Sequence, residues 1–172
     1  MKRKLSAVIA AVCAVFAVCA VAACNDDGGK NNGGDGNVYA SEDGTVVAFC
    51  ASSSVMTMTE TSSVKQYLDV LKENGDIAFN GYGSNNDFFI TEINGKAGEV
   101  VESTANSYKG YDWMFYIDFT TLTGDEALYG SDYSTVEYEG KTMYSANYGV
   151  TGIPCIEGHT YLFKYEYSEM SW

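Results

Sequence analysis

The side chains that could do chemistry are few and do not form a recognisable catalytic set. The 172 residues include one histidine, His159, and no Gly-x-Ser-x-Gly sequence. Nucleophilic catalysis needs a nucleophile, a base beside it and a third group that orients the base. A single histidine also argues against a metal centre built from several imidazoles. We therefore expect no enzyme, no catalytic residues, no metal and no cofactor, and we interpret His159 as a solvated turn residue after Gly158.

The net negative charge of the chain argues against some classes of binding partner. Asp and Glu number 23 against 10 Lys and Arg, which gives a formal net charge of -13. Nucleic-acid binding depends on a basic surface that neutralises phosphates, so we expect no nucleic-acid partner. The carboxylates are scattered through polar segments and are interpreted as a solvated acidic surface. Aromatic residues make up 14%, which is too high for a disordered chain.

The first 24 residues have the pattern of an export signal. A basic start is followed by an almost wholly apolar run from Leu5 to Ala23, and then by Cys24. This order is typical of a signal peptide. The sequence Val21-Ala22-Ala23-Cys24 resembles the bacterial lipobox, which implies that residues 1–23 are removed and that Cys24 carries a diacylglycerol. An uncleaved anchor or an ordinary signal peptide is the alternative, and each would still export the chain.

Export sets the expected location and the chemistry of the remaining thiols. We expect an extracytoplasmic protein, anchored to the bacterial cell membrane by the lipid on Cys24, because two acyl chains hold a protein firmly. Residues 24–44 are then the lipidated cysteine and a flexible, disordered Gly/Asn/Asp tether, and residues 45–172 form one domain. Outside the cytoplasm, Cys50 and Cys155 suggest a disulfide, with two free thiols as the alternative.

Strand patterns dominate the domain, and one helix interrupts them. Apolar residues at helical spacing from Val64 to Leu71 predict that helix, with a capping box at Ser63 and Gln66 and a stop at Gly75. One helix packed on a mostly antiparallel β-sheet is an α+β layer fold. Asn94-Gly95 and Glu139-Gly140 predict hairpin turns. The β-prone runs predict strands at residues 45–50, 55–59, 77–80, 88–93, 111–119, 135–138, 142–146 and 161–167.

The strand predicted at residues 111–119 carries the candidate binding residues. Trp113 shares one face with other large apolar side chains, so it is either a core residue or a platform for a ligand. Met114 and Tyr116 lie on the opposite face, and they are the better candidates for an exposed surface if Trp113 is buried. We therefore treat Trp113, Met114 and Tyr116 as possible ligand-binding residues.

Several segments, in order, carry a resemblance to one family. A helix over residues 63–74 precedes Phe89-Ile90-Thr91-Glu92-Ile93-Asn94-Gly95 and Tyr111-Asp112-Trp113-Met114-Phe115-Tyr116. The segments Thr135–Lys141, Tyr148-Gly149-Val150 and Gly158-His159-Thr160-Tyr161 complete the series. In this order they resemble the transcobalamin-like C-terminal domain (DUF4430), which occurs in secreted and lipid-anchored bacterial proteins and in animal cobalamin carriers. The resemblance covers roughly residues 62–167.

The resemblance implies a β-grasp-like fold and a binding function. In the animal carriers a Tyr-Trp-Gln strand approaches the corrinoid; Trp113 matches its Trp, and Met114 stands in place of its Gln. This implies a membrane-anchored extracytoplasmic binding module for a corrinoid or cobalamin-like small molecule, delivered to an importer. An imidazole such as that of His159 can ligate cobalt. The alternative is a surface adhesion or protein-interaction module that binds a surface protein and no small molecule.

Overall fold

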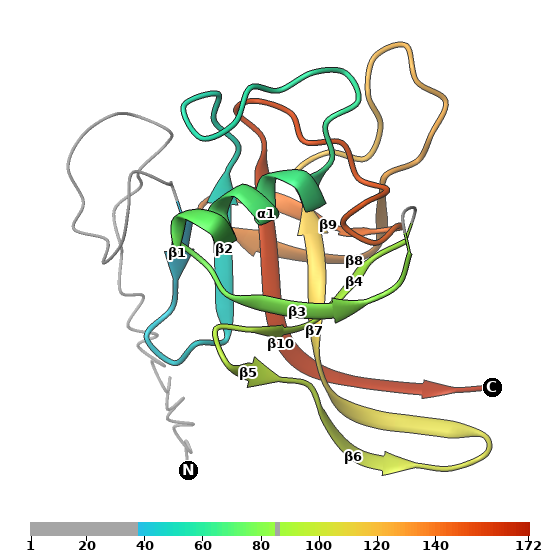
Figure 1. Cartoon of the computed structure of the whole chain (residues 1–172). Helices are drawn as coiled ribbons and strands as arrows, with labels where there is room; N and C mark the ends of the chain where they lie inside the picture. Colours follow the sequence, from blue (N-terminus) through green and yellow to red (C-terminus); the bar gives the residue numbers. More distant parts are fainter. Residues whose placement is uncertain (1–37, 85–86) are drawn as a thin grey trace, which may run out of the picture.

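The structure is a computed structural model that describes residues 38–84 and 87–172 (Figure 1). In these residues the strands pair in two sheets, and there is a single helix. No helix in these residues is long and apolar enough to cross a membrane. The elements in chain order are β1 (Val38–Ala40), β2 (Val46–Cys50), α1 (Val64–Asn74), β3 (Phe79–Tyr82), β4 (Phe89–Ile93), β5 (Lys96–Ala97), β6 (Glu99–Ser103), β7 (Ser107–Ile117), β8 (Gly130–Tyr138), β9 (Lys141–Ala146) and β10 (Thr160–Ser171).

The main sheet is built around two long antiparallel strands, β7 and β10. Its strand order is β1-β2-β10-β7-β9-β8, and β6 pairs with the other end of β7. β7 and β10 pair along eleven consecutive positions, from Tyr161 opposite Ile117 to Ser171 opposite Ser107. This architecture confirms the expected α+β class with a mostly antiparallel sheet.

Helix α1 forms where the sequence predicts it. Ser63 and Gln66 make the reciprocal hydrogen bonds of a capping box, which satisfy backbone donors at the first turn. Gly75 ends the helix in the left-handed conformation at φ 83°, which glycine adopts without steric cost. The apolar stripe from Val64 to Leu71 is fully buried. The helix therefore docks on the sheet through the face that the sequence marks.

Two apolar clusters lie on opposite faces of the main sheet. The larger cluster joins α1 and the small sheet β3-β4-β5 to one face, which Figure 1 shows with the helix lying in front of β10 and β7. The smaller cluster lies on the other face, where Ala48, Tyr116 and Leu162 contact Met143 of β9. The hairpin β8–β9 turns at Glu139-Gly140, as predicted, and both residues have positive φ. Each face of the sheet centre is thus covered.

One end of the main sheet extends beyond both clusters as an arm. We define the arm as β6, residues 107–112 of β7 and residues 166–171 of β10. In Figure 1 it projects from the body toward the C-terminus. Every residue of β6 is exposed, and so is most of β10 beyond Glu166. The sequence did not predict β6, because Glu99–Ser103 is short and carries two glutamates.

One predicted boundary and one predicted strand are wrong. The tether was expected to run to residue 44, but Val38–Ala40 forms β1 and pairs with β2. The intervening turn is held by Asp43, whose carboxylate accepts hydrogen bonds from Ser41 and Thr45. The strand predicted at residues 55–59 is a loop instead. Its apolar side chains still pack against the larger cluster, which explains their pattern.

Candidate functional site

A row of aromatic rings runs along β7 and β10, from the core onto the arm. In an antiparallel pair, residues directly opposite each other point to the same face. The register places Tyr165 opposite Trp113 and Tyr167 opposite Tyr111. Side chains of odd number on both strands therefore line the face that carries α1. We call this row the aromatic ladder; its members are Tyr161, Phe163, Tyr165 and Tyr167 on β10 and Tyr111, Trp113 and Phe115 on β7.

The rings of the aromatic ladder contact one another in an inner and an outer group. Phe115 stacks on Phe163 with centroids 4.7 Å apart. Further out, Tyr111 stacks on Tyr165 at 5.8 Å and meets Tyr167 edge to face at 5.5 Å. Such pairs each add about 0.5–1.5 kcal/mol beyond the area they bury. The arm is therefore held in line with the core by the ladder itself.

Exposure rises along the aromatic ladder. Tyr161 is 0% exposed, Trp113 is 7% exposed, Tyr111 is 40% exposed and Tyr167 is 48% exposed. We call Tyr111 and Tyr167 the exposed end of the ladder. Six of the twelve exposed large hydrophobic residues described lie on the arm or at its tip: Val100, Val101, Tyr111, Tyr167, Met170 and Trp172. Apolar surface gathered in this way marks an interaction site more often than scattered single residues do.

Trp113 is a core residue. Its indole Nε1 donates a hydrogen bond of 2.7 Å to the carbonyl oxygen of Lys96, which fastens β5 to the main sheet. The ring contacts Tyr165 at a centroid distance of 5.4 Å. An edge of Trp113 also lines a hollow of about 280 Å³, together with Val100, Tyr108 and Asp112. Of the two interpretations that the sequence left open, the structure favours the core residue.

Met114 and Tyr116 lie on the opposite face, as the alternation predicts, but they do not form an exposed surface there. Tyr116 is 1% exposed and belongs to the smaller apolar cluster, which Met114 also contacts. The Tyr116 hydroxyl donates a hydrogen bond to Glu166, and burial together with this bond raises the pKa of Tyr116 to about 12. The expectation of exposure is wrong for Tyr116, because the hairpin β8–β9 covers that face.

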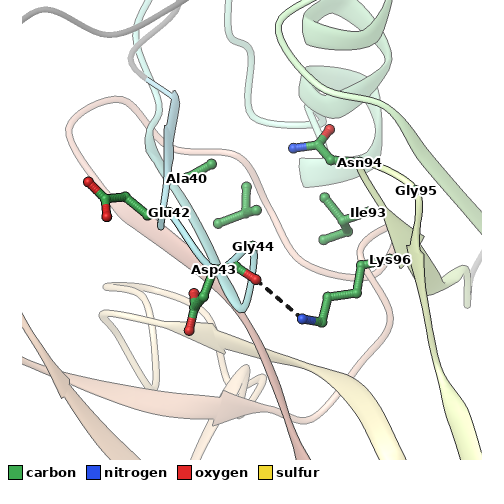
Figure 2. A pocket seen from close by; sticks show the side chains of 9 residues that line it. Ala40, Glu42, Asp43, Gly44, Ile93, Asn94, Gly95 and Lys96 are labelled. Carbon is green, nitrogen blue, oxygen red and sulfur yellow. Dashed lines mark hydrogen bonds between the residues drawn. The ribbon is translucent and has the colours of Figure 1, made fainter.

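A second hollow, of about 420 Å³, opens between the β1–β2 turn and the β4–β5 turn (Figure 2). Figure 2 shows the Lys96 ammonium reaching across it to the carbonyl oxygen of Asp43, at 3.3 Å. Hydrogen bonds from Ser41 and Thr45 lower the pKa of Asp43 to about 2. The hollow carries no aromatic side chain, and two of its charged residues, Asp43 and Lys96, already form hydrogen bonds in the turns at its rim.

Charged side chains surround the exposed end of the aromatic ladder. The Lys96 ammonium lies over the Tyr165 ring, 4.8 Å from its centroid. Further out, Lys109 forms ion pairs with Glu102 at 3.1 Å and Glu169 at 3.7 Å, and these carboxylates raise the pKa of Lys109. On the arm, glutamates outnumber lysines. The surface is therefore aromatic and acidic together.

His159 lies in a turn, as expected, but it has a partner. Its Nδ1 is 2.7 Å from Asp118, and its ring meets Phe119 edge to face. Asp118 also accepts hydrogen bonds from Lys141 and from the backbone of Thr160. This arrangement fixes the turn before β10. Among the described residues, no cluster of His, Cys, Asp and Glu has the form of a metal site.

The proposed disulfide between Cys50 and Cys155 is wrong. Cys155 is a free thiol, buried in the larger cluster 3.8 Å from the Met58 sulfur, and burial raises its pKa to about 12. Side chains alternate along β2, with Phe49 in the larger cluster, so Cys50 points to the opposite face. The sheet separates the two residues. Cys24, the predicted lipidation site, lies outside the described residues.

Comparison with known proteins supports the family resemblance over part of the chain. Residues 65–122 match the family model described as a domain of unknown function, DUF4430. This segment runs from α1 through β7, so it contains Tyr111 and Trp113 but not β10. No curated protein and no solved structure matches the chain.

Sequence reasoning missed the site-forming role of Tyr165, Tyr167 and Lys96. The alternation from Tyr161 to Tyr167 predicted the last strand, and the same pattern in residues 111–119 predicted a second strand with aromatic residues on one face. Pairing the two runs in antiparallel order would have indicated a continuous aromatic row. The contact of Lys96 with that row depends on how β5 crosses the sheet, for which the sequence carries no local signal.

Proposed function

We propose that this chain is a membrane-anchored extracytoplasmic interaction module that binds a protein or polymer of the cell surface through the exposed end of the aromatic ladder. The observation that carries the proposal is the concentration of exposed apolar residues on the arm, Tyr111 and Tyr167 among them. Tyrosine is favoured at interfaces because it combines a large apolar ring with a hydroxyl. The arm projects from the body (Figure 1), and Tyr111 and Tyr167 on it are exposed.

The two hollows described above support this choice over a small flat ligand. Drug-sized ligands occupy largely apolar pockets of about 300–1,000 Å³. The hollow beside Trp113 measures about 280 Å³, and the larger one of about 420 Å³ is rimmed by charged turn residues. The indole N–H of Trp113 is already hydrogen-bonded to the carbonyl oxygen of Lys96. The rings that remain available lie on a projecting surface, which fits a macromolecule.

The anchor is part of the same proposal. A lipidated Cys24 followed by a tether would keep the acidic domain outside the cell and close to the membrane. Because a serine hydroxyl does not accept the thioether-linked lipid, a Cys24→Ser variant is expected to lose incorporation of a labelled fatty acid. A variant that stays labelled would contradict the lipidation.

Photo-crosslinking in cells tests the interaction surface. A photoreactive phenylalanine analogue is placed at position 167 in one variant and at position 133 in a matched control. Tyr133 is 96% exposed but lies on β8, away from the arm. The proposal predicts discrete adducts from position 167 and none from position 133. Equal adducts at both positions, or none at 167, would contradict it.

A corrinoid or cobalamin-like small molecule, passed to an importer, is the second candidate. It is favoured by the hollow that Trp113, Tyr108 and Val100 line, and by the transcobalamin-like, β-grasp-like character that the family resemblance implies. Titration of the full chain with cobalamin and with cobinamide tests it by heat and by absorbance. A saturable change that a Val100→Trp variant abolishes would support the small ligand, since the larger side chain fills the hollow.

A further inference from the structure

The outer edge of β10 has no partner strand along the arm. β2 pairs with β10 only from Thr160 to Lys164, and a last backbone bond runs from Tyr165 to Thr45 at 2.7 Å. From Glu166 to Ser171, β7 is the one neighbour of β10 within the part of the chain that the structure describes. This segment pairs with β7 without a register shift, whereas β6 at the other edge of the arm carries a bulge.

The backbone groups that face outward along this edge can be assigned. In an antiparallel ladder the N–H and C=O of one residue point to the same neighbouring strand, and successive residues alternate. The Tyr165 N–H points to the β2 side, and the Trp172 N–H points to the β6–β7 hairpin, where it meets Asn106 at 3.0 Å. Tyr167, Glu169 and Ser171 therefore direct both backbone groups away from β7. Such an edge is a template for an added strand.

Side chains along the edge specify what kind of strand fits. On the ladder face, the residues of an added strand would lie beside the half-exposed ring of Tyr167 and the carboxylate of Glu169. The protein already pairs a cation with a ring of this row, because the Lys96 ammonium lies over Tyr165, the ring before Tyr167. On the other face the edge presents Met170, which is 54% exposed. A strand with cationic residues on one face and apolar residues on the other satisfies both sides.

A second copy of the chain does not satisfy the edge. Antiparallel pairing of β10 with its own copy about the centre of the free edge places Glu169 opposite Glu169. Like charges directly opposite each other destabilise a sheet. The net charge of -13 on each copy adds long-range repulsion. The acidic edge thus rejects its own copies and accepts a basic strand.

We propose that the free edge of β10 binds an extended segment of a partner protein as an added antiparallel strand, with Lys or Arg on the Tyr167–Glu169 face and apolar residues on the Met170 face. This deepens and rests on the proposed function, because it names the partner of the same aromatic surface. The added strand would use the outward backbone groups of Tyr167, Glu169 and Ser171. Its basic residues would cover the exposed end of the aromatic ladder.

The test uses the full chain in detergent micelles and a capped six-residue peptide of alternating lysine and valine. Binding is followed by titration and by amide hydrogen exchange. Glu169→Pro is compared with Glu169→Ala, which controls for the lost carboxylate. Proline is tolerated on an edge strand where its missing N–H faces solvent. Ser171→Pro repeats the test at the next outward position in case the first proline variant fails to fold.

The proposal predicts that the peptide slows exchange at Tyr167, Glu169 and Ser171, and that a glutamate–valine peptide does not. Loss of a backbone bond should weaken binding at least about tenfold, in Glu169→Pro relative to Glu169→Ala and in Ser171→Pro relative to the unsubstituted chain. A folded proline variant that binds as well as its own reference, or equal binding of the acidic peptide, would overturn it. The cross-link at position 167 separates the two ideas: it survives if only the strand addition is wrong and disappears if the interaction surface is wrong.

Discussion

Replacing Trp113 with phenylalanine should destabilise the fold without touching the exposed surface. The indole Nε1 donates a 2.7 Å hydrogen bond to the Lys96 carbonyl, and the ring is 7% exposed. Leaving the part-buried Lys96 carbonyl without its donor costs about 1–3 kcal/mol, and the smaller ring leaves part of the site empty. We expect a loss of about 2–3 kcal/mol in the free energy of unfolding, against about 5–15 kcal/mol for a typical domain.

Urea unfolding followed by circular dichroism measures this loss, and a thermal scan should show a midpoint lower by about 6–12 °C. Tyr165→Phe is the matched control, because its hydroxyl bonds the neighbouring carbonyl of Ala97 at an exposed site. That control should lose less than about 1 kcal/mol. A Trp113→Phe variant as stable as the wild type would refute the assignment of this indole as a structural anchor of β5.

Three further predictions concern the core, the helix and high pH. Gly149→Ala should lower stability by about 1–3 kcal/mol in urea unfolding, because an added Cβ would lie 2.5 Å from the Phe88 carbonyl oxygen. Ser63→Ala should cost about 1 kcal/mol by the same measurement, since it removes the helix cap. Burial raises the pKa of Tyr67 and Tyr116 from 10.0 to about 12; their neutral forms therefore stabilise the fold fully below pH 10, and unfolding at stepwise pH should show that stabilisation disappearing toward pH 12.

Local patterns were sufficient to predict the helix and the hairpin turns. The capping box, the apolar stripe and Gly75 act within one segment, so α1 follows from its own residues. Asn94-Gly95 adopts positive φ at both residues for the same reason. The alternation over residues 111–119 also gave the two faces of β7 correctly. These features depend on neighbours within a few positions in the chain.

Features set by distant segments could not be predicted. The burial of Tyr116 depends on the hairpin β8–β9 folding over that face, and the separation of Cys50 from Cys155 depends on which face each occupies. The sequence does not state either arrangement. The loop over residues 55–59 has a strand-like composition, but its apolar side chains pack on the core without a partner strand. The arm likewise results from the extra length of β7 and β10.

Footprinting on intact cells tests the central claim most directly, namely that a partner covers the exposed end of the aromatic ladder. Hydroxyl radicals oxidise accessible tyrosine and methionine side chains, and mass spectrometry measures the extent at each residue. The account predicts that Tyr111, Tyr167 and Met170 are oxidised several-fold less on cells than in the purified full chain, while Tyr133 is oxidised equally in both. Equal oxidation of the arm in both settings would contradict it.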